Sequence, residues 1–268
     1  SDWNLVAPKS LRVLTVYDMI SELYPDSFIA SANMSATKKS SIARADHIIC
    51  ISKNTQRDLC DIMDVDISKT SVIYLAADHL KKVDLHRCTL PQPYILYVGQ
   101  RGGYKNFATA LKAFALSKLH IEGFKLICFG GGSLKEYEHD LIKKLSINPD
   151  SVSQVSGNDE LLGTYYRHAS LYINPSHYEG FGIPILEAMM HNCPVICSDR
   201  SSMPEVAGNA AVLFNPDYPE SIANAMVKVI NDNNLRRNLI TLGSERQKYF
   251  TWDTCAHKTF QVYTNLLK

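Results

Sequence analysis

Two glutamates, Glu179 and Glu187, are separated by seven residues and could together bind one polar ligand. They lie in a segment, 175–187, that follows an apolar run and carries the signals of a loop entering a helix. Gly180 and Gly182 allow backbone N–H groups to approach a ligand without interference from side chains. The segment therefore predicts a cradle for an anion or for hydroxyl groups at a helix N-terminus. Each carboxylate alone also has an ordinary explanation, as a solvated side chain or a partner of the helix dipole.

A second loop of this kind follows the apolar run 94–98. Gly99 and Gly102 permit close backbone approach, while Arg101 and Lys105 bring two positive charges to the same place. Such a loop could hold a diphosphate. Basic residues after a strand are also often solvated, so this group is less specific than the glutamate pair.

The elements that must position these loops alternate along the chain, which predicts an α/β fold with parallel sheets. Apolar, β-branched runs that we expect to be strands are 11–16, 45–51, 70–75, 94–98, 125–129, 169–174, 194–198 and 211–214. Helix-length segments between them are 106–117, 135–146, 159–168 and 219–231. Pro184 suits the first turn of a further helix that carries Glu187.

A polar stretch, 78–93, has two prolines and no clear period, so we expect a linker with a boundary near residue 85. The predicted organisation is a partial Rossmann-like domain over 1–85, a complete one over 86–245 and a helix over 246–268 that crosses back to the first domain. The helix would offer an apolar face of Phe250, Trp252, Phe260, Tyr263 and Leu267. With three expected strands, the first domain would have an exposed sheet edge.

Taken together, these segments resemble family 4 of the retaining glycosyltransferases, which have two Rossmann-like domains (glycosyltransferase B type). The resemblance rests on the Glu-x7-Glu signature around Gly-Phe-Gly-x-Pro, on the Gly-x-Arg...Lys-Asn segment at 99–106, and on later segments in the family's order. Those later segments are 159–169, 194–199 and 201–206. The resemblance covers nearly the whole chain from Val13 onward and implies that the front of the first, acceptor-side domain is missing.

The resemblance assigns roles to individual residues. In the family, the Arg and Lys bind the donor diphosphate, the first glutamate and the amides after it hold the donor sugar, and the second glutamate holds the ribose. Backbone at 155–157 would line the nucleobase pocket. The implied donor-binding residues are Gly99, Arg101, Gly102, Lys105, Val155, Gly180, Phe181, Gly182, Ile183 and Glu187, and the implied catalytic residues are Glu179, Arg101, Lys105 and Asp18.

Two positions depart from the family pattern. Tyr17 stands where the family has a histidine that faces the donor, and a tyrosine cannot act as imidazole does near neutral pH. Asp18, which follows it, is retained, although a capping or turn role suits this carboxylate equally well. Asn192 replaces a glycine after the signature helix and tolerates the left-handed conformation expected there.

The implied activity is transfer of a hexose, with retention and without a metal ion, from a nucleoside diphosphate sugar to a glycan or lipid-linked acceptor in bacterial surface polysaccharide synthesis. GDP-mannose is the first candidate donor by resemblance, and UDP-sugars stay open, as do the acceptor and the linkage. No cofactor is expected. The alternative is a sugar-nucleotide-binding fragment or subunit that is inactive without the missing N-terminal part or a partner chain, bound or self-associated at the exposed sheet edge.

Composition narrows the possible classes of protein further. A net charge of +1 and a pI of about 7.6 do not indicate nucleic-acid binding. No apolar run approaches the roughly 20 residues of a spanning helix, so we expect a cytoplasmic enzyme, with peripheral association at the inner membrane face if the acceptor is lipid-linked. Seven scattered cysteines lack Cys-x-x-Cys spacing and predict reduced, mostly buried thiols. Asp64-Val-Asp66 and Gly130–Gly132 resemble a metal motif and a dinucleotide loop, but we expect turns at both.

Overall fold

The computed structural model describes residues 10–27, 31–77, 90 and 93–268, and its contacts divide the chain into two compact units. Unit 1 comprises Ser1–Ala76, Tyr178–Phe181 and Phe250–Lys268. Unit 2 comprises Ala77–His177 and Gly182–Tyr249. The expected boundary near residue 85 lies outside the described residues. Each unit is α/β, as the alternation of strands and helices predicted.

Unit 1 contains a three-stranded parallel sheet in the order β1-β2-β3. Its strands are β1 (Val13–Val16), β2 (His47–Cys50) and β3 (Thr70–Val72). Its α-helices are α1 (Ile20–Leu23), α2 (Ser31–Ala43), α3 (Lys53–Met63) and α11 (Trp252–Leu266), and its short 3₁₀ helices are η2 (Pro25–Ser27) and η3 (Ile67–Lys69). The sheet packs its apolar side chains against α2 and α3 in a small core of Val16, Met19, Ile42, Ile48, Cys50 and Leu59.

Unit 2 contains a six-stranded parallel sheet in the order β6-β5-β4-β7-β8-β9. Its strands are β4 (Tyr94–Val98), β5 (Lys125–Phe129), β6 (Val152–Val155), β7 (Leu171–Asn174), β8 (Val195–Ser198) and β9 (Ala211–Phe214). Numbered from β4, this is the Rossmann order 3-2-1-4-5-6. The direction of winding reverses between β4 and β7, and ligands of such sheets bind outside the carboxyl ends of the strands at that point.

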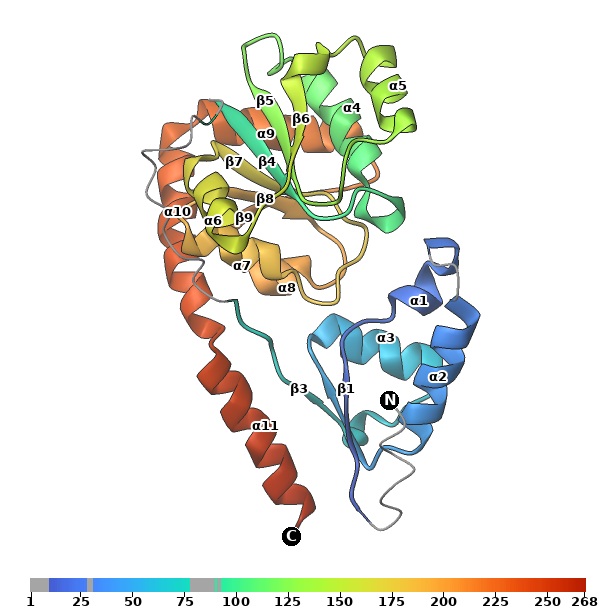
Figure 1. Cartoon of the computed structure of the whole chain (residues 1–268). Helices are drawn as coiled ribbons and strands as arrows, with labels where there is room; N and C mark the ends of the chain where they lie inside the picture. Colours follow the sequence, from blue (N-terminus) through green and yellow to red (C-terminus); the bar gives the residue numbers. More distant parts are fainter. Residues whose placement is uncertain (1–9, 28–30, 78–89, 91–92) are drawn as a thin grey trace. The chain divides into compact units, whose positions relative to one another are not determined.

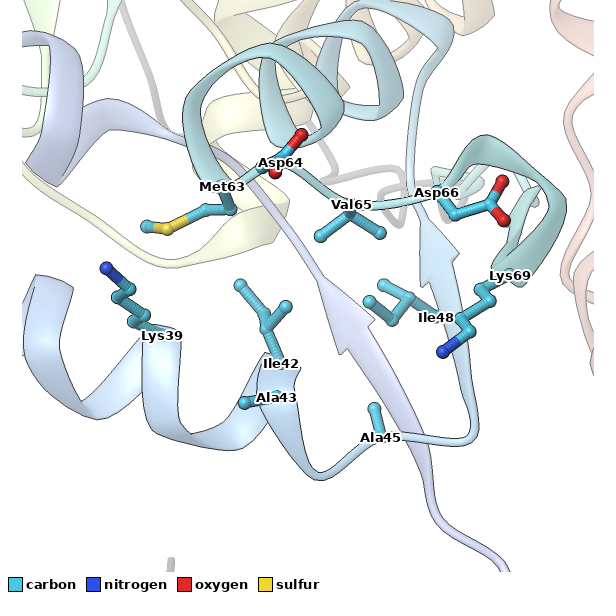
Figure 2. Close-up of a pocket in the computed structure, with 10 residues that line it drawn as sticks. All are labelled: Lys39, Ile42, Ala43, Ala45, Ile48, Met63, Asp64, Val65, Asp66 and Lys69. Atoms are coloured by element: carbon cyan, nitrogen blue, oxygen red, sulfur yellow. The ribbon is translucent and has the colours of Figure 1, made fainter.

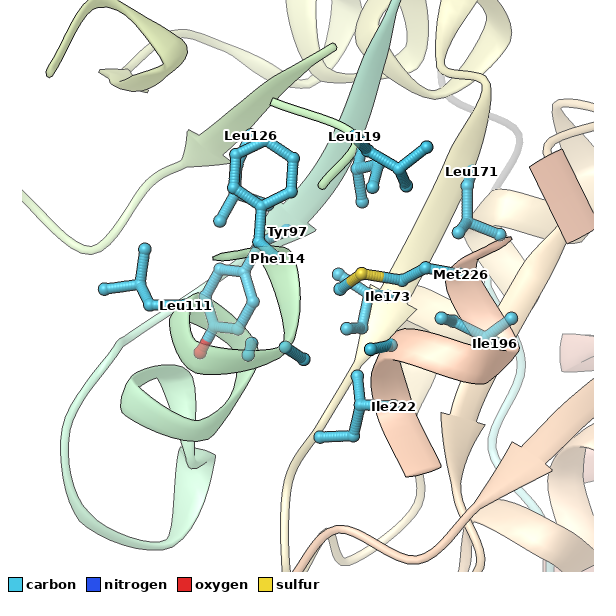
Figure 3. Close-up of a cluster of buried hydrophobic side chains, with 14 of the residues drawn as sticks. Tyr97, Leu111, Phe114, Leu119, Leu126, Leu171, Ile173, Ile196, Ile222 and Met226 are labelled. Atoms are coloured by element: carbon cyan, nitrogen blue, oxygen red, sulfur yellow. The ribbon is translucent and has the colours of Figure 1, made fainter. Parts of the chain in front are cut away.

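Helices cover both faces of the unit 2 sheet (Figure 1). Its α-helices are α4 (Phe107–Ser117), α5 (Glu136–Lys144), α6 (Asp159–His168), α7 (Ile183–Met190), α8 (Met203–Ala207), α9 (Pro219–Asn231) and α10 (Asn233–Arg246). Short 3₁₀ helices are η5 (Gly103–Lys105), η6 (Pro149–Ser151) and η7 (Gln247–Tyr249). On one face, alternate strand residues such as Tyr97, Leu126 and Ile173 pack against Phe114 of α4 and Met226 of α9 (Figure 3). On the other face, Phe129 and Tyr172 contact aromatic rings of α6.

Several element bounds match the sequence predictions, whereas the strands expected over 45–51, 70–75 and 169–174 are shorter in the structure. Two larger features also differ. Strand β6 was not expected, because polar side chains interrupt its apolar pattern at this sheet edge. The C-terminal stretch is interrupted at 247–251, where Thr251 caps α11, so it is not one continuous helix. The expected apolar face of α11 is largely exposed, from 45% at Trp252 to 79% at Leu267, whereas Phe250 just before the helix is buried.

Cysteine thiols in the described part of the chain are all unpaired, as predicted, and Cys88 lies outside that part. Cys50, Cys128, Cys193 and Cys197 are buried. Burial raises the pKa of the Cys128 thiol to about 12, so this group stays protonated at neutral pH. In the described ranges, no helix has the length and apolar character needed to cross a membrane.

Candidate functional site

The loops that follow β4 and β7 meet where the winding of the unit 2 sheet reverses. Asn106 joins them: its side-chain Nδ2 donates to Pro175 O at 3.0 Å and to Pro216 O at 2.8 Å, the latter in the loop after β9. Asn106 is buried and has a left-handed backbone with φ of 58°. His177 N also donates to Tyr104 O at 2.8 Å. Three strand-end loops are thereby fixed against one another.

Helix α7 begins directly after this junction, as the sequence predicted. Gly182 precedes it with φ of 105°, a conformation that suits glycine, and a proline occupies its first turn. The first N–H groups of a helix have no partner within the helix. The start of α7, at Gly182 and Ile183, is therefore suited to an anion or a hydroxyl group.

Glu187 lies in the second turn of α7, and its carboxylate is held by a buried tyrosine. Tyr166 of α6 donates its hydroxyl to Glu187 Oε2 at 2.9 Å. The Tyr166 ring packs edge-on against Tyr172 and stacks on His191, whose Nδ1 lies 2.8 Å from Glu187 O. Burial raises the pKa of Glu187, an effect that the hydrogen bond from Tyr166 opposes. Burial and the nearby Glu187 raise the pKa of Tyr166 well above its usual value, so Tyr166 acts as a hydrogen-bond donor.

Sequence reasoning missed Tyr166. It lies inside the segment 159–169 that resembles the family, but 21 residues separate it from Glu187 in the chain, and no spacing rule connects the two.

Arg101 has a different environment from the one expected of a diphosphate ligand. Its side chain is 2% exposed, and its Nε donates to Glu138 Oε1 at 2.9 Å. Its Nη1 donates to Gly130 O at 3.1 Å. Its Nη2 donates to Gly132 O and Ser133 O, both at 2.8 Å. The guanidinium is thus directed into the protein, because the loop after β5 supplies carbonyl groups that match its fork of N–H donors.

That loop forms the tight turn expected from its glycines. Gly130, Gly131 and Gly132 have φ of 79°, 70° and 73°. Gly130 N donates to Val155 O at 2.8 Å, which ties the turn to the end of β6.

Other residues predicted for the donor site in unit 2 lie at the same carboxyl edge of the sheet. Gly99 follows β4 with φ of 111°, and its N–H donates to Phe129 O at 2.9 Å. Gly102 is exposed and has open space on its side-chain side. Lys105 ends η5, with its ammonium group 5.3 Å from the centre of the Tyr104 ring.

Glu179, by contrast, belongs to the segment Tyr178–Phe181 of unit 1. Tyr178 donates its hydroxyl to Asp58 Oδ2 at 2.7 Å, and Thr55 Oγ1 donates to Gly180 O at 3.3 Å. A side chain at Gly180 would place its Cβ 2.1 Å from Tyr17 O. Glycine is required at this position for the close backbone approach rather than for ligand access alone.

Asp18 has the turn role that was the alternative interpretation of this carboxylate. Asp18 Oδ1 accepts from Ile20 N at 3.0 Å, at the start of α1. The Tyr17 side chain, at the expected histidine position, is 59% exposed. Asn192 adopts the left-handed conformation that the sequence predicted, with φ of 56°.

Asp64 and Asp66 form turns, as expected: Asp64 ends α3 with φ of 52°, and Asp66 caps η3. Together with Lys39 and Lys69 they line a cavity of about 300 Å³ over an apolar floor that includes Ile48 (Figure 2). This cavity lies at the amino ends of β2 and β3, whereas α/β sheets bind ligands at carboxyl ends. Within the described ranges, no group of three or more His, Cys, Asp or Glu side chains is arranged to hold a metal ion.

Comparison with known proteins connects this geometry to one family. The model of the glycosyl transferases group 1 matches residues 86–246. The chain is 32% identical over 223 residues to O-antigen chain mannosyltransferase RfbU of Salmonella typhimurium, covering 81% of this chain and 60% of that protein. It is 31% identical over 177 residues to O-antigen chain mannosyltransferase B of Escherichia coli, covering 64% and 46%. The chain therefore spans about half the length of these relatives.

Among solved structures, the fold is similar to that of a sucrose-phosphate synthase from Thermosynechococcus elongatus. The TM-score is 0.81 at 24% identity, and the match covers 99% of this chain and 70% of the other. At this identity the likeness establishes the architecture of the glycosyltransferase B type, which confirms the predicted fold class.

Proposed function

Because the chain belongs to the glycosyl transferases group 1, we propose that it binds a nucleoside diphosphate sugar and transfers the hexose, with retention and without a metal ion, to a glycan or lipid-linked acceptor. The observation that carries this proposal is the Glu187 carboxylate, which Tyr166 orients in the second turn of α7, the helix that follows the point where the winding of the sheet reverses. A carboxylate with one oxygen fixed can accept hydrogen bonds from two neighbouring ribose hydroxyls.

We propose GDP-mannose as the donor and a bacterial surface polysaccharide as the product. The support is that two relatives with more than 30% identity bear the name O-antigen chain mannosyltransferase. A lipid-linked acceptor would bring the enzyme to the inner face of the membrane.

The proposed reaction breaks the bond between the anomeric carbon and the diphosphate oxygen. The acceptor oxygen forms its bond to the same face of that carbon, and its proton passes to the departing phosphate oxygen. Negative charge grows on the diphosphate as it leaves, and positive charge or aligned N–H groups nearby stabilise it. Lys105 and the amides of Gly182 and Ile183 supply these groups in the proposal, so no metal ion is required.

Glu179 is proposed to position the donor sugar together with Gly180 and Phe181. Asp18 is the weaker catalytic candidate, since its carboxylate already accepts a hydrogen bond from Ile20 N in the turn before α1. Val155 is proposed to line the base pocket with its backbone at the end of β6.

Calorimetric titration of this chain with UDP, GDP, UDP-glucose and GDP-mannose, with and without EDTA, tests the proposal. We expect one base to be preferred, no effect of EDTA, and a loss of affinity of at least about tenfold in Glu187→Ala, since a hydrogen bond to a charged group contributes roughly 1.5–3 kcal/mol. Glu122→Ala is the matched control, because Glu122 is exposed in the turn before β5 at the opposite edge of the sheet. Failure of every nucleotide to bind, or unchanged binding in Glu187→Ala, would contradict the proposed function.

A further inference from the structure

A buried ion pair connects the two glycine-rich loops beside the proposed donor site. Arg101 lies in the loop after β4, and Glu138 lies in the first turn of α5, with side chains that are 2% and 1% exposed. Glu138 uses both carboxylate oxygens. Oε1 accepts from Arg101 Nε at 2.9 Å, and Oε2 accepts from Lys135 N at 2.7 Å, which caps α5.

The same arginine fixes the turn between β5 and α5. Its two Nη atoms donate to the carbonyl oxygens of Gly130, Gly132 and Ser133. Glycine adopts a positive φ about as readily as a negative one, so a run of three glycines has little preference of its own for the shape of this turn. The planar guanidinium supplies the constraint, because its N–H groups point in fixed directions.

The turn 130–133 also contacts the backbone segments on both sides of it. A Cβ at Gly131 would lie 2.5 Å from Gly99 O, so the turn packs directly on the backbone after β4. Gly130 accepts from Gln154 Nε2 at 3.3 Å and donates to Val155 O at 2.8 Å. The turn 130–133 therefore lies between the loop proposed for the diphosphate and the strand end proposed for the base.

Four of the five N–H groups of the guanidinium are donated to Glu138 and to the three carbonyl groups, and the side chain is only 2% exposed. Bidentate binding of a phosphate by Arg101 would therefore require the guanidinium to leave these partners. An unpaired carboxylate would then stay buried, which is strongly destabilising. From this geometry, and resting on the proposed function, we infer that Arg101 is a positioning residue: paired with Glu138, it holds the turn 130–133 in the shape that the donor site requires and does not itself ligate the diphosphate.

Hydrogen exchange without ligand tests the structural half of this inference, independently of any activity. In Arg101→Lys and in Glu138→Gln, the backbone amides of residues 130–135 should exchange roughly tenfold faster than in the wild type, since each variant removes hydrogen bonds to a charged group. Peptides from β7 and α7 should be unchanged, and thermal unfolding should show that both variants are folded. Unchanged exchange at 130–135 in folded variants would overturn the inference.

Nucleotide titration of the same variants tests the functional half. Glutamine at 138 can satisfy Arg101 or Lys135 N, but not both, so a positioning role predicts about tenfold weaker binding of a nucleoside diphosphate in Glu138→Gln as well as in Arg101→Lys. The double variant should bind no more weakly than the weaker single variant, because both changes release the same turn. A direct ligand predicts the opposite for Glu138→Gln, which would free the guanidinium and leave affinity equal or higher.

The proposed function and the positioning role of Arg101 are contradicted by different results. Absence of binding in the wild type contradicts the proposed function. Normal binding in the wild type together with undiminished binding in Glu138→Gln contradicts the positioning role of Arg101 alone.

Discussion

At the scale of single residues, hydrogen-bond partners decide which charged groups can face a ligand. The sequence predicted both Arg101 and Glu187 as donor ligands because each lies in a segment that follows a strand. In the structure, carbonyl groups enclose the Arg101 guanidinium, whereas a single hydroxyl orients the Glu187 carboxylate. The partners, Glu138 and Tyr166, lie 37 and 21 residues away in the chain. Sequence spacing identifies the loops, but it does not reveal partners that only the fold brings together.

The Tyr166 hydroxyl gives a prediction at this scale. Tyr166→Phe removes one donor from a carboxylate and should weaken nucleotide binding by about tenfold, as expected for a hydrogen bond to a charged group. Tyr263→Phe is the matched control, since Tyr263 lies on α11 and is 47% exposed. Calorimetry with the preferred nucleotide measures both. Equal affinity in Tyr166→Phe and the control would show that Glu187 needs no orientation.

The pH dependence of binding should shift in the same variant. Burial raises the pKa of Glu187, and the Tyr166 hydrogen bond lowers it, so losing that bond raises the pKa further. The ionised carboxylate is the form that accepts hydroxyl donors. On acidification, binding should therefore fail at a higher pH in Tyr166→Phe than in the wild type, measured by titrations between about pH 4 and 8. Loss of nucleotide binding at the same acidic pH in both proteins would contradict the role of Tyr166 in lowering the pKa of Glu187.

At the scale of elements, the sequence predicts those strands and helices whose local pattern is unambiguous. The strands β4, β5 and β9 and the helices α6 and α9 have the predicted bounds, because continuous apolar runs or amphipathic periods end at clear turn residues. Strand β6 escaped prediction because Ser153 and Gln154 interrupt its apolar pattern. At a sheet edge a strand needs fewer apolar residues, so pattern alone is a weak guide there.

The glycine turn after β5 gives a prediction at the scale of elements. Gly131→Ala and Gly132→Ala share a positive φ, of 70° and 73°, which costs an L-residue roughly 1–2 kcal/mol. A methyl group at Gly131 would also lie 2.5 Å from Gly99 O, whereas at Gly132 it meets nothing within 4 Å. Urea unfolding should show that Gly131→Ala loses about 1–3 kcal/mol more than Gly132→Ala. Equal losses would mean that the two loops do not pack as described.

At the scale of the whole molecule, the alternation of elements predicts the fold class, and the order of the strands then places the site. The predicted donor residues of unit 2 converge because β4 and β7 are neighbours at the point where the winding reverses. The segment Tyr178–Phe181 belongs to unit 1, a division that no local sequence signal marks. Contacts such as that of Tyr178 with Asp58 join residues far apart in the chain and depend on the complete fold.

A crystal structure of this chain grown with its preferred nucleoside diphosphate tests the central claim most directly. We expect ribose hydroxyls within hydrogen-bonding distance of the Glu187 carboxylate, roughly 2.5–3.2 Å, and the diphosphate at the first amides of α7. Arg101 should keep its bonds to Glu138 and to the turn 130–133. A nucleotide bound elsewhere, for example in the cavity lined by Lys39 and Lys69, would contradict the claim.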